Sequence, residues 1–279
     1  MEDYIIKVNH LKYRYSENDD YSLNDVSFNV KRGEWLSIIG HNGSGKSTLV
    51  SALDGLISID SGSIEVDSID LNPDSVWEVR DRIGLVFQNP DDQFVGATVE
   101  DDVAFGLQNH NIEYNQMHQI VNKALDAVGM SAFKMKSPSN LSGGQKQRVA
   151  LAGIIALHPQ IIILDESTNM LDPAGKEQIL SVIMDLKERY KLTVISITHD
   201  VNELKLANRI LVMNDGKVVD ENTPSEIFSQ PQKLINMGLT LPYPEIIKRH
   251  LNKLGVETPD QYLNEGAFIK WIQQFPLKK

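Results

Sequence analysis

The nine residues Gly-His-Asn-Gly-Ser-Gly-Lys-Ser-Thr at positions 40–48 constrain the fold more than any other stretch of the chain. They fit the phosphate-loop pattern G-x-x-x-x-G-K-[ST], whose last two positions are Lys46 and Ser47. The apolar run before them, residues 34–39, predicts a short buried strand, and residues 47–54 predict the start of a helix. A strand, a glycine loop and a helix in this order favour a nucleotide site over a chance glycine-rich turn.

The chemistry of such a loop follows from its residue types. Glycines allow the backbone N–H groups to turn inward and surround phosphate oxygens. The helix N-terminus adds its partial positive charge. Lys46 is therefore expected to reach the β- and γ-phosphates, and the Ser47 hydroxyl is expected to bind Mg²⁺.

Length, charge and cysteine content limit the class of protein. A chain of 279 residues holds one large domain, or one domain with an appendage. It contains no cysteine, no apolar run of the roughly 18 residues that cross a bilayer, and no signal-peptide pattern, which predicts a cytosolic protein. The net charge of −11 argues against non-specific binding to nucleic acid and against unaided binding to anionic lipid.

The N-terminal segment, residues 4–30, alternates apolar and polar positions, so it predicts two or three antiparallel strands around a polar loop at 16–20. Tyr13 and Tyr15 lie near that loop. One of them could stack on an adenine ring, or both could be half-buried strand residues. Their spacing alone leaves both interpretations open.

Three further predicted strands end in polar residues. Residues 83–88 end at Gln88, residues 161–164 run into Asp165 and Glu166, and residues 192–198 end at His199. Ligands of open α/β sheets bind outside the carboxyl ends of the strands, so these side chains are site candidates; a loop cap is the alternative for Gln88. Because strand side chains alternate, the two carboxylates are predicted to point in opposite directions, one to Mg²⁺ and one to a water beside the γ-phosphate.

Residues 98–140 predict helices without strands, beginning at a capping box of Thr98 with Asp101. Residues 141–148 then open another helix, where Ser-Gly-Gly leaves N–H groups free, although Ser142 could also be a simple N-cap. Further along the chain, Asp172-Pro173 predicts the start of a helix, and residues 209–214 and 217–221 predict a hairpin.

The last forty residues are expected to be helical at 245–254 and 266–275, with residues 258–261 capping the second helix. This tail is too short for a core of its own, so we expect it to pack on the main domain or on a partner.

The motifs in this order resemble the ATPase subunits of ATP-binding cassette (ABC) transporters. The motifs are the phosphate loop 40–48, Gln88, the Leu-Ser-Gly-Gly-Gln signature 141–145, the strand 161–166, the loop to Asp172 and the switch His199. The resemblance implies an α/β phosphate-loop NTPase core with an antiparallel β subdomain, a helical insert at about 90–155 and a small helical C-terminal extension. It divides the chain into an ATP-binding domain, 1–240, and an extension, 241–279.

The same resemblance implies a role for each site residue. Glu166 and His199 are the expected catalytic residues, as general base and γ-phosphate switch, and Ser47, Gln88 and Asp165 are expected around Mg²⁺. Ser142, Gly143, Gly144 and Gln145 are expected to contact the nucleotide of a second subunit, so that two cassettes enclose two ATP molecules. The expected nucleotide-binding residues are Tyr15, Gly40, His41, Asn42, Gly43, Ser44, Gly45, Lys46, Ser47, Thr48 and Gln88.

A narrower resemblance is to the energy-coupling factor importers for vitamins and to the related cobalt and nickel importers. It rests on residues 86–94, Val-Phe-Gln-Asn-Pro-Asp-Asp-Gln-Phe, and on the helical extension. It implies a second ABC ATPase as partner in a heterodimer, of which this chain resembles the first member. It also implies a transmembrane coupling protein docked at residues 91–94 and the insert groove, and a substrate-specific membrane subunit.

Residues 167–172, Ser-Thr-Asn-Met-Leu-Asp, depart from the general ABC pattern in the loop expected to cross the dimer interface. The implied location is the cytoplasmic side of the cell membrane, as a peripheral subunit, with no nucleic-acid partner. The alternatives are a cobalt or nickel importer ATPase, a soluble ABC ATPase acting on ribosomes or nucleic acid, and a regulatory module that does not hydrolyse ATP.

Overall fold

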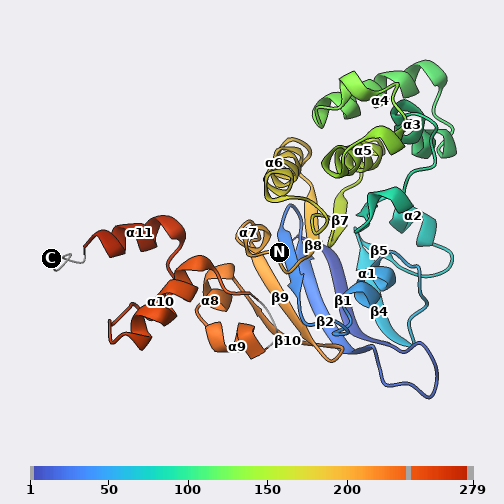
Figure 1. Cartoon of the computed structure of the whole chain (residues 1–279). Helices are drawn as coiled ribbons and strands as arrows, with labels where there is room; N and C mark the ends of the chain where they lie inside the picture. Colours follow the sequence, from blue (N-terminus) through green and yellow to red (C-terminus); the bar gives the residue numbers. More distant parts are fainter. Residues whose placement is uncertain (1–2, 237–239, 275–279) are drawn as a thin grey trace.

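The computed structural model describes residues 3–236 and 240–274. Two β-sheets form its centre, a four-stranded sheet of order β2-β1-β4-β5 and a six-stranded sheet of order β10-β9-β3-β8-β7-β6 (Figure 1). The helical insert lies beyond one side of the larger sheet, and the C-terminal helices extend away from the body on another side (Figure 1). The predicted α/β core, antiparallel subdomain, helical insert and helical extension are all confirmed.

The smaller sheet is antiparallel throughout. The predicted N-terminal strands are β1, Tyr4–Tyr13, and β2, Leu23–Lys31; the sheet is completed by β4, Ser61–Val66, and β5, Ile69–Asp70.

The larger sheet inserts β3, from early in the chain, between the later strands β8 and β9. Its strands are β3, Trp35–Ile39, β6, Ile83–Val86, β7, Ile161–Asp165, β8, Thr193–Ile197, β9, Arg209–Asn214, and β10, Lys217–Asn222. β3 pairs in parallel with β8 and β9, and β7 pairs in parallel with β8 and β6. Only the β9–β10 hairpin is antiparallel, and its turn residues Asp215 and Gly216 have φ of 47° and 73°, as an Asp-Gly hairpin turn requires.

Both faces of the larger sheet are buried, as the uninterrupted apolar run in β7 predicted. Ile161 and Ile163 pack in one core cluster with helix α1, Lys46–Leu53, which lies between the two sheets. Ile162 and Leu164 pack in the other, with the helices α3, Val99–Asn109, α4, Tyr114–Ala127, α5, Gly143–Ala156, and α6, Pro173–Tyr190. The sheet edge that carries the site is thus held rigidly between two helical layers.

Helix boundaries follow the predicted caps. Thr98 and Asp101 form a reciprocal capping box at α3, and the Asp172 side chain accepts a hydrogen bond from the Gly175 amide at α6. The described part of 98–140 contains no strand. Two short helices complete the domain, α2, Val76–Arg80, and α7, Val201–Leu204.

The C-terminal part contains α8, Pro224–Phe228, α9, Pro231–Asn236, α10, Tyr243–Lys253, and α11, Glu265–Gln273. Of the predicted last helix, Phe275 lies outside the described residues. The cap prediction at 258–261 is wrong: Asn264 caps α11 by accepting a hydrogen bond from the Ala267 amide, while the Thr258 hydroxyl bonds to Asn252 in the preceding helix.

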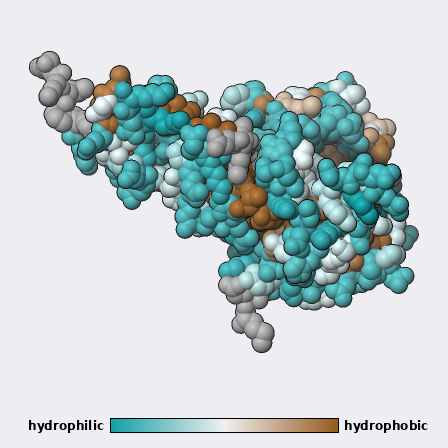
Figure 2. Space-filling view, turned by 90° about the horizontal axis from the view of Figure 1, so that it is seen from below, coloured by the Kyte–Doolittle hydropathy of each residue, from teal (hydrophilic) through white to brown (hydrophobic). Residues whose placement is uncertain are grey.

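The tail packs on the main domain at its start and again between α10 and α11. Leu241 is buried in the large core cluster, the Tyr262 ring contacts Phe228, and Lys205 pairs with Glu265. Away from these contacts, exposed apolar side chains follow α10 and α11, among them Ile247, Leu254, Ile269 and Ile272, and Figure 2 shows brown hydrophobic residues along this projection. Among the described residues, no helix has the length and apolar character needed to span a membrane.

Candidate functional site

The phosphate loop is a tight turn that admits only glycine at two positions. A Cβ on Gly40 would lie 2.3 Å from the Met213 carbonyl oxygen, and one on Gly45 would lie 2.5 Å from the Ser22 carbonyl oxygen. Gly45 also has φ of 100°, in the region that side chains rarely adopt. The loop therefore approaches its neighbours too closely for any larger residue, and α1 begins directly after it.

Lys46 is held against this loop. Its side chain is buried, and Nζ donates hydrogen bonds to the carbonyl oxygens of Gly40, at 2.8 Å, and His41, at 2.9 Å. Burial lowers the pKa of the Lys46 amine, and the nearby carboxylates of Glu166 and Asp165 oppose that shift. The ammonium is thus aimed along the loop, where a phosphate chain would lie.

The remaining loop side chains differ in exposure. Asn42, Gly43 and Ser47 are exposed, whereas Ser44 is buried and its hydroxyl has no hydrogen-bond partner among the described residues.

Tyr15 lies beside the loop: its hydroxyl is 3.1 Å from Thr48 Oγ1, and its ring stands edge-on to Tyr13. Tyr15 is 66% exposed. An exposed ring fixed next to the loop presents an open face for stacking, whereas Tyr13 is more covered.

The two adjacent carboxylates lie at the end of β7, but the prediction that strand alternation sets their directions is wrong. Asp165 ends the strand on the face of Ile161 and Ile163, toward α1. Glu166 has left the strand: its φ is 50°. Its amide donates to the Ile197 carbonyl at 3.0 Å, and its Oε2 accepts from Asn169 Nδ2 at 2.9 Å. A left-handed turn and a side-chain bond direct Glu166.

His199 comes from the neighbouring strand β8 and meets Glu166. Nε2 of His199 lies 3.4 Å from Glu166 Oε1, an ion-pair distance without hydrogen-bond alignment, so this nitrogen has no hydrogen-bond partner. Burial and the Lys46 charge lower the pKa of the imidazole, against the opposing pull of Glu166. Burial and Glu166 raise the pKa of Asp165, while Lys46 opposes this. Four titratable groups therefore interact at the ends of three adjacent strands.

Gln88 lies in the loop after β6, because that strand ends at Val86 and not at Gln88 as predicted. Its side chain is exposed. The loop is braced by Gln93, a residue that the sequence reasoning did not single out as a site residue: its Nε2 donates to the Leu85 carbonyl at 3.1 Å, and its Oε1 accepts from the Phe87 amide at 3.3 Å. Because an amide side chain has both a donor and an acceptor, Gln93 can bond to the backbone of this segment as a neighbouring strand would. The residue type alone does not predict this role.

The signature residues lie apart from the phosphate loop. Ser142 caps α5 in a reciprocal capping box with Gln145, so the N-cap interpretation is correct as far as local structure goes. These residues line a cavity of about 490 Å³ with Met170, Leu171 and Asp172, and no phosphate-loop residue lines it. A Cβ on Gly144 would meet nothing within 4 Å. The signature end of α5 is therefore open, and capping does not require its second glycine.

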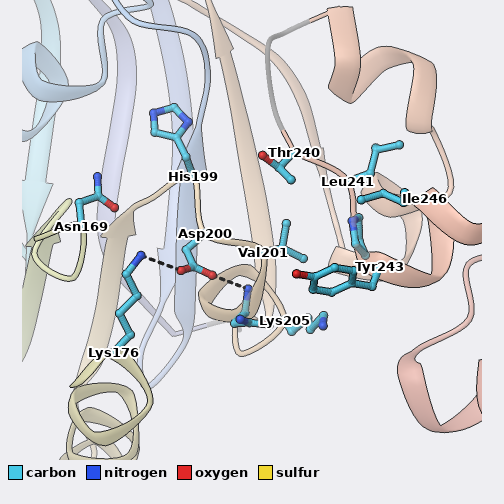
Figure 3. A pocket seen from close by; sticks show the side chains of 12 residues that line it. Asn169, Lys176, His199, Asp200, Val201, Lys205, Thr240, Leu241, Tyr243 and Ile246 are labelled. Atoms are coloured by element: carbon cyan, nitrogen blue, oxygen red, sulfur yellow. Dashed lines mark hydrogen bonds and ion pairs between the residues drawn. The ribbon is translucent and has the colours of Figure 1, made fainter. Parts of the chain in front are cut away.

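A second cavity, of about 410 Å³, lies between the switch loop and the start of the tail. Figure 3 shows Asn169, Lys176, His199 and Asp200 on one side and Thr240, Leu241 and Tyr243 on the other. The Lys176 ammonium is 3.0 Å from Asp200 Oδ2, the ion pair dashed in Figure 3.

The donor set suits Mg²⁺ better than a cage-bound metal. Among the described residues, no group of three or more histidine, cysteine, aspartate or glutamate side chains is arranged so that it could hold a metal ion by itself. The Ser47 hydroxyl and the Asp165 carboxylate are hard oxygen donors next to a phosphate loop. Mg²⁺ takes such a set, because it binds through one or two protein oxygens, water and substrate phosphates.

Comparison with known proteins agrees with this geometry. The family described as ABC transporter matches residues 23–169, and the family described as energy-coupling factor transporter EcfA1 C-terminal domain matches residues 242–279. The energy-coupling factor transporter ATP-binding protein EcfA1 of Levilactobacillus brevis is 53% identical over 274 residues, 98% of each chain. That of Latilactobacillus sakei is 54% identical over 268 residues, 96% of each chain.

Solved structures are similar over most of the chain. The structure of cbiO1 from Clostridium perfringens, part of the ABC transporter complex cbiONQ, has a TM-score of 0.78 at 34% identity and covers 91% of this chain and 98% of its own. A dimeric ATP-binding cassette in a post-hydrolysis state, bound to ADP and Pi, has a TM-score of 0.70 at 31% identity and covers 78% of this chain and 98% of its own. The chain belongs to the ABC transporter ATPases, and within them to the EcfA1 family of energy-coupling factor transporter ATP-binding proteins.

Proposed function

We propose that this subunit hydrolyses Mg²⁺-bound ATP at the phosphate-loop edge, and that closure of two cassettes over ATP powers uptake of a vitamin or other micronutrient. The observation that carries the proposal is the interacting group of Lys46, Asp165, Glu166 and His199 at one sheet edge. These are the charges that phosphoryl transfer uses, since its catalysis consists of positioning and charge stabilisation.

Nucleotide binding is assigned to the loop and its flanks. The backbone of residues 40–48 surrounds the phosphates, and Lys46 exchanges its two carbonyl bonds for phosphate oxygens. Tyr15 stacks on adenine with its open ring face. Ser47, Asp165 and Gln88 would hold Mg²⁺, with Asp165 acting through water. The bound ion would neutralise charge that develops on the phosphate oxygens.

Catalysis is assigned to Glu166 and His199. Glu166 orients and deprotonates the attacking water, and its hydrogen bond from Asn169 fixes the carboxylate direction. His199 uses the same ring nitrogen that has no hydrogen-bond partner to contact the γ-phosphate. The lowered pKa favours the neutral imidazole while the site is empty of phosphate, and the proposed contact with the γ-phosphate needs the tautomer that carries its proton on Nε2.

The second half of each site is assigned to another cassette. Ser142, Gly143, Gly144 and Gln145 lie at an open helix end that points away from this chain's own phosphate loop. In that arrangement the partner's nucleotide meets their N–H groups. Asn169 and Met170 lie in the loop between the two edges, and the exposed Met170 would contact the partner. We infer that the partner is a second, different ABC ATPase.

The remaining assignments concern the membrane complex. We assign residues 1–240 to the ATP-binding domain, with the insert at about 90–155, and residues 241–279 to the extension. A transmembrane coupling protein docks on the insert and on residues 91–94, a substrate-specific membrane subunit selects the cargo, and the cassette sits on the cytoplasmic side of the cell membrane. The EcfA1 relatives above, with 53% and 54% identity, favour this over the cobalt or nickel alternative. The net charge of −11 speaks against the soluble nucleic-acid alternative.

The test uses Glu166→Gln in the detergent-purified transporter complex. We expect ATP turnover to fall by roughly a thousandfold while ATP still binds, because only the base is lost. Lys46→Ala should instead weaken ATP binding itself. Turnover that persists in Glu166→Gln would contradict the assigned base, and recovery of the chain with nucleic acid and no membrane protein would contradict the transport assignment.

A further inference from the structure

The carboxyl of Glu203, close in sequence to the switch histidine, is buried and has no role in the chemistry assigned above. Glu203 is in α7, four residues after His199, and is 2% exposed. The Thr168 hydroxyl donates to its Oε2 at 3.1 Å. Thr168 is itself 1% exposed and lies two residues after Glu166, in the loop that leads to the partner-facing edge.

Two more hydroxyls stabilise the charged form of the same carboxyl by hydrogen bonding: that of Ser196, in β8, and that of Thr198, directly after the strand. In the described chain no lysine, arginine or histidine forms an ion pair with it. Burial raises the pKa of Glu203 to about 7, although hydrogen bonding by the three hydroxyls lowers the pKa.

Counting donors and acceptors fixes the direction of this network. The Ser196 hydroxyl already accepts from the Trp35 indole at 3.0 Å and lies 2.8 Å from the Ser37 hydroxyl. A hydroxyl has one proton and two acceptor sites, so Ser196 donates to Glu203 only if Ser37 donates to Ser196. Thr198 accepts from the Asp200 amide at 3.0 Å, which leaves its own proton for Glu203. With Ser37 donating to Ser196, the protons of all three hydroxyls are available for Glu203, whose carboxylate form only accepts hydrogen bonds.

We propose that Glu203 is a positioning residue that couples the switch loop to the loop after Glu166, through its hydrogen bond with Thr168. This rests on the roles proposed above for Glu166 and His199. The carboxyl belongs to α7, which begins two residues after His199, and Thr168 belongs to the segment that carries Glu166 and Asn169. A second link ties the switch segment to α6, the helix after that loop, since Lys176 pairs with Asp200 next to His199.

The consequence is that base and switch move as one unit. The Glu166 to His199 contact is a loose 3.4 Å pair, so it does not fix their relative position. The buried bond from Thr168 to Glu203 joins the two segments in a place that water does not reach, in addition to the bond from the Glu166 amide to the Ile197 carbonyl.

The test compares two substitutions of Thr168 in the intact transporter complex. Thr168→Val keeps the shape of the side chain and removes the hydroxyl, and Thr168→Ser keeps the hydroxyl. Since a small misplacement of catalytic groups lowers turnover steeply, we expect Thr168→Val to reduce kcat about tenfold, with KM for ATP changed less than about twofold. Thr168→Ser should restore most of kcat.

Ser37→Ala is the matched control, because Ser37 belongs to the same buried network but contacts neither loop. It should alter Tm and leave kcat unchanged. Wild-type kcat in Thr168→Val, or an equal loss in Ser37→Ala, would overturn the proposal. Glu203→Gln should reproduce the Thr168→Val defect and add no further loss when combined with it. If Glu166→Gln already retains turnover, the proposed site itself fails; if only the Thr168 result fails, this coupling alone is wrong.

Discussion

The phosphate-loop edge and the signature edge are both glycine-rich helix starts, yet they differ in what surrounds them. At the first, Gly45 touches a backbone carbonyl and Lys46 is bonded to the loop. At the second, Gly144 has nothing within 4 Å and Ser142 bonds only to its own helix. The first edge gathers its lysine, carboxylates and histidine within one chain, whereas the second is open at Gly144. In the proposed arrangement, a single chain contributes one half to each of two sites.

The largest expected effect concerns the crowded glycine. Gly45→Ala places a Cβ 2.5 Å from the Ser22 carbonyl at a φ of 100°, so the loop must shift. We expect ATP affinity to fall about a hundredfold, since a misplaced loop loses several phosphate contacts at once, each worth about 1–3 kcal/mol. Isothermal titration with a non-hydrolysable ATP analogue measures this. Unchanged ATP affinity in Gly45→Ala would show that close packing around Gly45 is not needed for binding, and would contradict the contrast drawn between the two edges.

The open glycine should behave in the opposite way. Gly144→Ala meets no atom in this chain and lies inside α5, so the free energy of unfolding should rise by roughly 0.5–1 kcal/mol. ATP binding to the isolated chain should stay unchanged. Turnover in the complex should fall about tenfold if the partner's nucleotide approaches this backbone closely. Wild-type turnover would mean that the signature edge contacts no nucleotide.

Glu203, which bonds to the loop between the two edges, should make the stability of the fold depend on pH. The pKa of Glu203 is about 7 in the folded chain against an ordinary 4.5, so its contribution to stability is present below about pH 4.5 and is lost as the pH rises through 7. Relative to Glu203→Gln, the wild-type free energy of unfolding should therefore fall by a few kcal/mol over this range. Urea denaturation of both proteins at several pH values without nucleotide measures the free energies of unfolding. The same pH dependence in wild type and Glu203→Gln would contradict the prediction.

The smallest expected effect concerns the brace of the Gln88 loop. Gln93→Ala removes two hydrogen bonds, to Leu85 and Phe87, which together contribute about 1–3 kcal/mol. We expect a several-fold rise in the Mg²⁺ concentration needed for half-maximal turnover, with ATP affinity unchanged. Gln93→Glu is the control, because it keeps the acceptor for the Phe87 amide and loses only the donor to Leu85. An unchanged Mg²⁺ requirement in Gln93→Ala would show that the brace does not position Gln88.

Most of the architecture could be predicted from local patterns. The four apolar residues of β7, the Thr98 capping box and the Asp215-Gly216 turn each fix their element through contacts within a few residues. The order of the motifs placed the phosphate loop, the carboxylates and His199 at strand ends, and the sheet order brings β3, β8 and β7 side by side.

The errors have one cause. Glu166 leaves the strand because its amide bonds to β8 and its side chain bonds to Asn169, and α11 is capped by Asn264 because Thr258 bonds back to α10. Strand alternation and cap patterns describe a segment alone, so they miss a bond that another segment supplies.

By itself, the sequence determined the glycine loop, its lysine and the polar strand ends, because backbone conformation and side-chain chemistry are properties of the residues. Only the tertiary structure decided that Glu203, a residue type that is seldom fully buried, lies buried among hydroxyls from two other segments. It also decided that Lys46, Asp165, Glu166 and His199 interact, although 153 positions separate the first from the last. Desolvation and hydrogen bonding depend on neighbours in space, and the packed sheet is what makes these residues neighbours.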